Sequence, residues 1–410
     1  MTFYIGFIAD THIGYRDGMK MTKEGVNIRE QDGYDALAEV VDKLIQLKEE
    51  GKLHVVVHGG DLFHTSHPSI RSLVWVQYQL GRLHKAGIPF YGMAGNHDAS
   101  DEQANIAAVA PINDPSKGIH ALYKPAGRYK IEHPEAEGDI YLHAIAHHGL
   151  SANEAPEIEV IDGAVNILTT HGAAVHPSNK TLLHCMDSPR EQIIPTEVLL
   201  NDDINIRLLG HYHTRGKVVE GTHYAGSTLR RGWSDDPGAR GITLVGVEPD
   251  GESSVVEYID IYQRPQYDLE VIDAKGLTAE EVEERVIAHL EKTKTDAQGN
   301  PIQPLLRQKV ENVPLTVKNM VNRNLLHKAA SHGLTWKLDM ETEAIDKSQK
   351  SKAKVSLEDR RTFAGAGMVY MYKDFAKENN SLLSHMEEET QTEIIDKGKK
   401  YLEKAEEEGN

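Results

Sequence analysis

Short apolar, β-branched runs recur along the first half of the chain and are typical of buried strands. The five runs are Phe3–Ala9, Val55–His58, Phe90–Ala94, Ile167–Thr169 and Ile206–Leu209. Between the first three runs, apolar residues recur instead at helical spacing, over Asp35–Glu50 and Ser69–Ala86, and a glycine follows each segment as an expected cap. This alternation of strand and helix predicts parallel strands with helices on the faces of a sheet.

A second sheet is predicted further along the chain, because residues 141–261 are richer in strand patterns, including Ile242–Val247 and Ser254–Ile261. Near Gln263 the pattern changes, and Thr278 then opens a capping-box sequence at the start of an expected helix. A strand, a helix and a strand should follow, which together predict a small α+β domain. These are Leu305–Val313, Val321–Ser331 and Leu334–Leu338.

The polar, lysine-rich stretch 346–354 is expected to be a linker, followed by two charged helices with a thin apolar stripe. The predicted fold class is therefore α/β, with two packed mixed sheets flanked by helices, a small α+β domain and a helical C-terminal segment. We expect three parts, at residues 1–262, 263–345 and 346–410.

Polar residues of metal-binding types follow each of the five predicted strands directly. The motifs are Asp10-Thr11-His12, Gly60-Asp61, Gly95-Asn96-His97-Asp98, Thr170-His171-Gly172 and Gly210-His211-Tyr212-His213. Because the carboxyl ends of strands in an open α/β sheet face one crevice, we expect these motifs to converge. Carboxylate, imidazole and amide oxygen donors together suit Mn²⁺, Fe²⁺ or Zn²⁺. The sequence thus predicts a site for two divalent metal ions.

Such a pair of ions would act on a phosphoester. Two metal ions about 3.5–4 Å apart can orient and deprotonate a water and stabilise the attacking and leaving oxygens. One carboxylate must bridge them, and Asp61 is placed for this at the end of the second strand. His97, next to the expected ligand Asn96, is the candidate donor to the phosphate or the leaving oxygen.

Composition changes this picture little. The 410 residues are 39% hydrophobic and 26% charged, as in ordinary globular proteins, and no apolar run reaches the roughly 18 residues of a membrane span. The first strand leaves no room for a leader peptide, and a single cysteine, Cys185, favours a reducing cytoplasm. The net charge of −18 argues mildly against extensive non-specific nucleic-acid contacts, but it is compatible with a nuclease or simply with solubility.

The motifs together resemble those of the calcineurin-like metallophosphoesterase superfamily, over residues 1 to about 232. The chain is more closely similar to the SbcD-type nuclease subunit of the double-strand-break-repair complex, and this match extends more loosely to about residue 345. The segments that carry the closer resemblance are Asp10–Arg16, Gly60–His64 and Tyr224–Ser227.

The resemblance implies roles for individual residues. A first metal position would be formed by Asp10, His12, Asp61 and His213. A second metal position would be formed by Asp61, Asn96, His171 and His211. His97 would be the donor to the transition state, and His64 would be a second catalytic histidine near the phosphate.

The resemblance also implies an Mn²⁺-dependent 3′→5′ exonuclease on duplex ends and an endonuclease on single strands, acting in DNA repair or recombination. Residues 264–343 would form a capping domain that shapes the DNA channel. The terminal helices would dock on an SbcC-type coiled-coil ATPase. A homodimer would form through helices near the second and third motifs.

Two other functions stay open at this stage. A phosphodiesterase for small molecules would gain little from the extra domain, whereas a DNA enzyme needs the reach. A non-catalytic scaffold should have lost ligands, yet every expected position is filled. His143, His147 and His148 fit no motif, and we expect them to be structural. The arginines Arg16, Arg230 and Arg231 fit phosphate contacts and fold bracing equally well.

Overall fold

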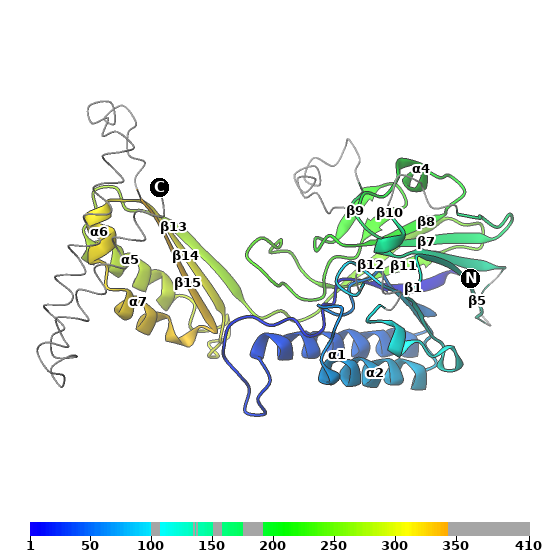
Figure 1. The fold of residues 1–410 in the computed structure, drawn as a ribbon, viewed down its shortest axis with the longest axis horizontal. Coiled ribbons are helices and arrows are strands. Elements are labelled where there is room, and N and C mark those ends of the chain that lie inside the picture. Colours follow the sequence, from blue (N-terminus) through cyan, green and yellow to red (C-terminus); the bar gives the residue numbers. More distant parts are fainter. Residues whose placement is uncertain (100–106, 134–135, 137, 151–157, 175–191, 343–410) are drawn as a thin grey trace, which may run out of the picture. The chain divides into compact units, whose positions relative to one another are not determined.

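The computed structural model describes residues 1–99, 107–133, 136, 138–150, 158–174 and 192–342. Two six-stranded sheets and one three-stranded sheet organise this part of the chain (Figure 1). None of the helices in the described ranges is long and apolar enough to cross a membrane.

The first sheet has the strand order β12-β11-β1-β2-β3-β4, in which β1 to β4 pair parallel, β11 pairs antiparallel with β1, and β12 pairs antiparallel with β11. Its strands are β1 (Phe3–Ile8), β2 (Val55–His58), β3 (Phe90–Met93), β4 (Ile119–Leu122), β11 (Gly241–Val247) and β12 (Ser253–Asp260). Helices α1 (Ile28–Glu49) and α2 (Ile70–Lys85) cover one face of this sheet (Figure 1).

The second sheet has the order β5-β6-β7-β8-β10-β9, with β6, β7, β8 and β10 parallel. Its strands are β5 (Ala126–Ile131), β6 (Ile140–Ile145), β7 (Val165–His171), β8 (Ile206–Gly210), β9 (Gly216–Val219) and β10 (Thr222–Tyr224). The short helix α4 (Thr196–Leu199) precedes β8. The expected pair of packed mixed sheets is confirmed.

Alternating side chains of the first sheet build two separate cores. Phe3, Ile5 and Phe7 of β1 pack with β-strand residues of the second sheet, such as Ile167, in the core between the sheets. Ile8 packs instead with residues of α1 and α2. This period of two is the pattern of a strand buried on both faces, and it fixes which strand ends face the crevice.

The three-stranded sheet has the order β13-β14-β15 and forms part of the segment predicted as α+β. Its elements are β13 (Gln266–Asp273), α5 (Ala279–Glu291), β14 (Leu305–Val313), α6 (Leu315–Met320), α7 (Arg323–Ala329) and β15 (Thr335–Thr342). The predicted capping box is present, with the Thr278 side chain accepting from the Glu281 N–H. The expected domain boundaries remain a prediction, and the linker and terminal helices lie outside the described residues.

Two helix predictions need correction. Helix α1 begins at Ile28, capped by Asn27, and not at Asp35. The sequence pattern hides this first turn because it buries the polar residues Arg29 and Glu30, which are each 1% exposed. The helix expected over residues 321–331 is α7 followed by a short 3₁₀ turn, and the preceding α6 was not expected.

Candidate metal centre

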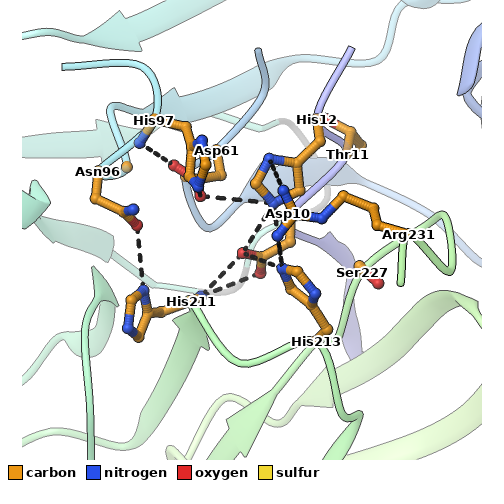
Figure 2. A network of polar contacts seen from close by, with 12 residues as sticks. Asp10, Thr11, His12, Asp61, Asn96, His97, His211, His213, Ser227 and Arg231 are labelled. Atoms are coloured by element: carbon orange, nitrogen blue, oxygen red, sulfur yellow. Dashed lines mark hydrogen bonds and ion pairs between the residues drawn. The ribbon is translucent and has the colours of Figure 1, made fainter. Parts of the chain in front are cut away.

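The ends of five strands, three from the first sheet and two from the second, meet at one place. Figure 2 shows Asp61, Asn96 and His211 gathered there. Asp10, Asp61 and Asn96 follow β1, β2 and β3. His171 ends β7, and His211 directly follows β8. The convergence expected from the sequence is thus present in the fold.

The backbone is strained at this meeting point. Five non-glycine residues in the described part of the chain have a positive φ, and four of them are candidate ligands: Asp10 (50°), His12 (46°), Asp61 (55°) and His211 (108°). Such conformations cost about 1–3 kcal/mol each and persist where surrounding structure enforces them. Here the His12 N–H donates to the Asp61 carbonyl at 3.0 Å, which ties two strained segments together.

The first metal position brings together donor atoms of Asp10, His12 and His213, all within 4.8 Å of one another. The Nε2 atoms of His12 and His213 are 3.2 Å apart. Asp10 Oδ1 lies 3.9 Å from the former and 4.0 Å from the latter. Asp61 Oδ2 is 3.6 Å from His12 Nε2. Two carboxylates and two imidazoles therefore face one small volume.

The second metal position is equally close-set. Asn96 Oδ1 lies 3.0 Å from His171 Nε2 and 3.2 Å from His211 Nδ1. The same His171 nitrogen is 3.5 Å from Asp61 Oδ2. Asp61 therefore faces both positions, as a bridging carboxylate must. Burial alone would raise the pKa of Asp61, but the neighbouring His171 and His12 hold it well below its usual range.

His97 lies beside both positions, and a hydrogen bond on the side of its ring away from them fixes its orientation. Its Nδ1 lies 2.9 Å from the carbonyl oxygen of His64, so an Nδ1–H donates there and Nε2 faces Asp61 Oδ2 at 4.0 Å. The rings of His64 and His97 are stacked at 5.1 Å. Burial and the charge of Arg231 lower the pKa of His64 to about 4. Both predicted catalytic histidines thus border the candidate ligands.

Two ligand histidines are oriented through their second ring nitrogen. His171 Nδ1 lies 2.8 Å from the carbonyl oxygen of Gly59. His213 Nδ1 lies 3.1 Å from Asp235 Oδ1. A partner of this kind selects the tautomer and turns the opposite nitrogen toward the site. Sequence reasoning missed Asp235, because an acidic residue in a polar loop, here followed by Asp236, carries no pattern that distinguishes it.

Asp98 joins the loops that carry the ligands. Its side chain is buried and accepts the N–H groups of Leu62, Phe63 and Gly95 at 2.9, 2.7 and 3.1 Å. These bonds fasten the loop after β2 to the loop after β3. Asp98 is therefore the structural member of the Gly-Asn-His-Asp motif.

Glycines allow close approach at the site, both between the two sheets and between neighbouring loops of the first sheet. A Cβ on Gly210 would lie 2.1 Å from the carbonyl oxygen of Gly59, and one on Gly95 would lie 2.2 Å from Asp61 Oδ1. Neither position can carry a side chain without displacing backbone or a candidate ligand. The glycines of these motifs are thus needed for close approach.

The three unassigned histidines differ from one another. His143 is structural as expected, because it lies in β6 and its Nε2 is 2.9 Å from Asn166 Oδ1. His147 lies beyond the strand in a short 3₁₀ turn, and its ring centroid is 5.9 Å from that of His211 and 6.1 Å from that of His171. It thus borders the second metal position. His148, in the same turn, has no role that the structure explains.

A cavity of about 350 Å³ opens onto the centre and is lined by Asp61, Asn96, His97, His213 and Arg231, among others. Its donor set of carboxylate, imidazole and amide oxygen fits borderline divalent metal ions better than Ca²⁺. The converging geometry and the strained ligand backbone agree with this fit. The residues present are therefore suited to hold two such ions.

The sequence model of the calcineurin-like phosphoesterase family matches residues 3–243, and the chain belongs to this family. It is 28% identical to the DNA double-strand break repair protein Mre11 of Sulfurisphaera tokodaii, over 63% of this chain and 63% of that protein. It is 25% identical to the protein of the same name from Sulfolobus acidocaldarius, over 74% of each chain. The first relative is matched over somewhat less than two thirds of its length. The resemblance expected from the motifs is confirmed.

Proposed function

We propose that this protein is a metal-dependent nuclease that cleaves DNA phosphodiester bonds during end processing in repair or recombination. The observation that carries the proposal is the pair of adjoining metal positions that share Asp61, with His97 beside them. The similarity to proteins named DNA double-strand break repair protein Mre11 supports DNA as the substrate. We further propose 3′→5′ exonuclease and single-strand endonuclease activities.

The side chains have separate tasks in this reaction. Two bound divalent ions, for which Mn²⁺ suits the donor set, would polarise the phosphodiester and lower the pKa of water. His97 donates from Nδ1 to the His64 carbonyl, so in the imidazolium form its Nε2 carries the second proton, which it would deliver to the leaving oxygen. The stacked ring of His64 holds His97 in this orientation and adds a hydrogen-bonding group near the phosphate.

A phosphodiesterase for small molecules is the second candidate function, since the same chemistry would serve any phosphodiester. The segment 263–342, with its own three-stranded sheet, favours the larger substrate. A small activated diester and DNA therefore have to be compared in the same experiment.

Partners are part of the proposal. An SbcC-type coiled-coil ATPase would dock on residues 346–410, which lie outside the described residues. Truncation after Lys354 should spare cleavage but lose co-purification of that ATPase, and retained co-purification would refute this docking site.

A homodimer through α2 is supported by an outward apolar stripe of Ile70, Val74 and Tyr78, exposed by 81%, 58% and 59%. Val74→Glu should yield monomers in light scattering, while Gln46→Glu at an exposed position of α1 should not. If both variants stay dimeric, the interface lies elsewhere.

The decisive test is cleavage of end-labelled duplex DNA and circular single-stranded DNA with Mn²⁺, Mg²⁺ or EDTA, beside bis-p-nitrophenyl phosphate. Manganese-dependent loss of both DNAs, absent in His97→Ala, would support the nuclease. Turnover of the small ester with untouched DNA, also after addition of the ATPase, would favour the alternative.

A further inference from the structure

Arg231 points its guanidinium into the metal centre and not toward solvent (Figure 2). Its Nη2 lies 2.9 Å from His213 Nε2, and its Nη1 lies 3.2 Å from His64 Nδ1. The same Nη1 is 3.3 Å from His12 Nδ1. Its Nε is buried and finds no hydrogen-bond partner among the described residues. The side chain thus borders the first metal position and the proposed catalytic histidine at once.

The main chain of Arg231 is held on both sides. Its N–H donates to Asp235 Oδ2 at 2.8 Å, and its carbonyl accepts from the hydroxyl of Tyr15 at 3.0 Å. The preceding carbonyl, of Arg230, accepts from Arg29, a fully buried side chain of α1. A loop that is fixed at three successive points presents the guanidinium in one place, which is what a preorganised binding group requires.

Asp235 connects this arginine to a candidate metal ligand. One carboxylate oxygen, Oδ1, pairs with His213 Nδ1 at 3.1 Å, and the other, Oδ2, accepts the Arg231 N–H. A single side chain therefore fixes both groups.

A nearby arginine, Arg240, has a structural role and differs from Arg231 in the groups that it binds. Arg240 is buried, and it donates to the carbonyl oxygens of His213 and Asp236. Arg231 faces imidazole rings that would be occupied by metal ions and substrate. A guanidinium so close to two divalent cations is repelled unless an anion lies between them. A phosphodiester supplies that anion, and the planar guanidinium matches its oxygens.

We infer that Arg231 binds a non-bridging oxygen of the substrate phosphate, and that Asp235 is the positioning residue that couples this contact to the first metal position. The inference rests on the proposed phosphodiester chemistry, but not on DNA being the substrate. The sequence leaves open whether Arg231 contacts phosphate or supports the fold, and the inference favours phosphate binding.

The test measures metal and anion binding separately from turnover. Calorimetric titration with Mn²⁺ alone should show two equivalents for Arg231→Gln, as for the unsubstituted protein. Inhibition of bis-p-nitrophenyl phosphate hydrolysis by inorganic phosphate should weaken at least about tenfold in this variant, and Arg231→Lys should recover part of the loss. Asp235→Asn should impair both readouts, with Mn²⁺ affinity at one position falling by about 10- to 100-fold.

Controls for folding and charge come from the same domain. Arg128→Gln and Asp139→Asn remove surface ion pairs and should change neither readout. Asp235→Glu keeps the charge and serves if Asp235→Asn fails to fold by circular dichroism. Unchanged phosphate inhibition in Arg231→Gln, or unchanged Mn²⁺ binding in the Asp235 variants, overturns the inference. If DNA is not cleaved but the small ester is hydrolysed normally and the variants behave as expected, only the proposed nuclease function is overturned.

Discussion

The two metal positions are built from similar residues but are supported in different ways. In the first, His213 is oriented by a side chain, the carboxylate of Asp235. In the second, His171 is oriented by the main chain, through the carbonyl of Gly59. A side-chain partner can be changed by one substitution, whereas a main-chain partner is fixed by the fold itself. We therefore expect the first position to be tunable and the second to be tied to stability.

The two histidines that are oriented in these different ways also differ in burial. His171 is fully buried at the end of β7, where Gly59 and Gly210 bring the two sheets together. The side chain of His213 is 14% exposed and follows β8 in a loop. Substitutions of the shared ligand, of a residue beside the ligands, of a ligand in each position and of a residue in the loops behind them test how far the two metal positions differ.

Loss of the shared carboxylate should have the largest effect. Asp61→Ala removes the group that faces both positions, so both Mn²⁺ equivalents and cleavage should disappear. Metal content by mass spectrometry and a DNA cleavage assay would measure this. Cleavage at the unsubstituted rate with Mn²⁺ would disprove the binuclear mechanism.

Loss of His97 should abolish catalysis without touching either position. We expect His97→Ala to bind two Mn²⁺ ions and to cleave about 10²- to 10⁴-fold more slowly, since a proton donor is lost but no ligand. Metal analysis and single-turnover kinetics address the two parts. Empty metal positions in this variant would show that His97 is a ligand or a structural residue.

The two positions can be separated by one substitution in each. His213→Ala and His171→Ala should each lose one Mn²⁺ equivalent, but the latter should lower the free energy of unfolding more, by about 1–3 kcal/mol, because it leaves a fully buried carbonyl unpaired, whereas Asp235 is partly exposed to water. Urea denaturation in EDTA measures this difference without metal. Equal destabilisation by both substitutions would remove the proposed contrast.

The loop behind the second position offers the smallest effect. In the unsubstituted protein, three backbone N–H groups donate to the two carboxylate oxygens of Asp98. Asp98→Asn leaves only one acceptor oxygen, so at least one of these hydrogen bonds is lost, at a cost of about 1 kcal/mol. Mn²⁺ affinity should fall at the second position more than at the first. A larger loss at the first position would place the support elsewhere.

The sequence predicted much of this site because strand runs and the turns after them obey local rules. Asp10, Asp61 and Asn96 could be placed at one crevice since parallel strands end at the same edge. Asp235 could not, because its role depends on a long loop that returns to His213. His147 was expected to be structural and lies instead beside the ligands, since nothing local shows that the chain turns at Ala146 toward them.

The proposed ligands also come from both sheets, so that a bound ion would join the two sheets. Asn96 belongs to the first sheet and His171 to the second, 75 residues apart along the chain, and one ion bound by both would act as a removable cross-link. Closing so long a loop restricts the unfolded chain as a disulfide does, with no cysteine involved. A chelator would then act on this protein as a reductant acts on a disulfide-bonded one: it would remove a cross-link and weaken the contact between the two sheets.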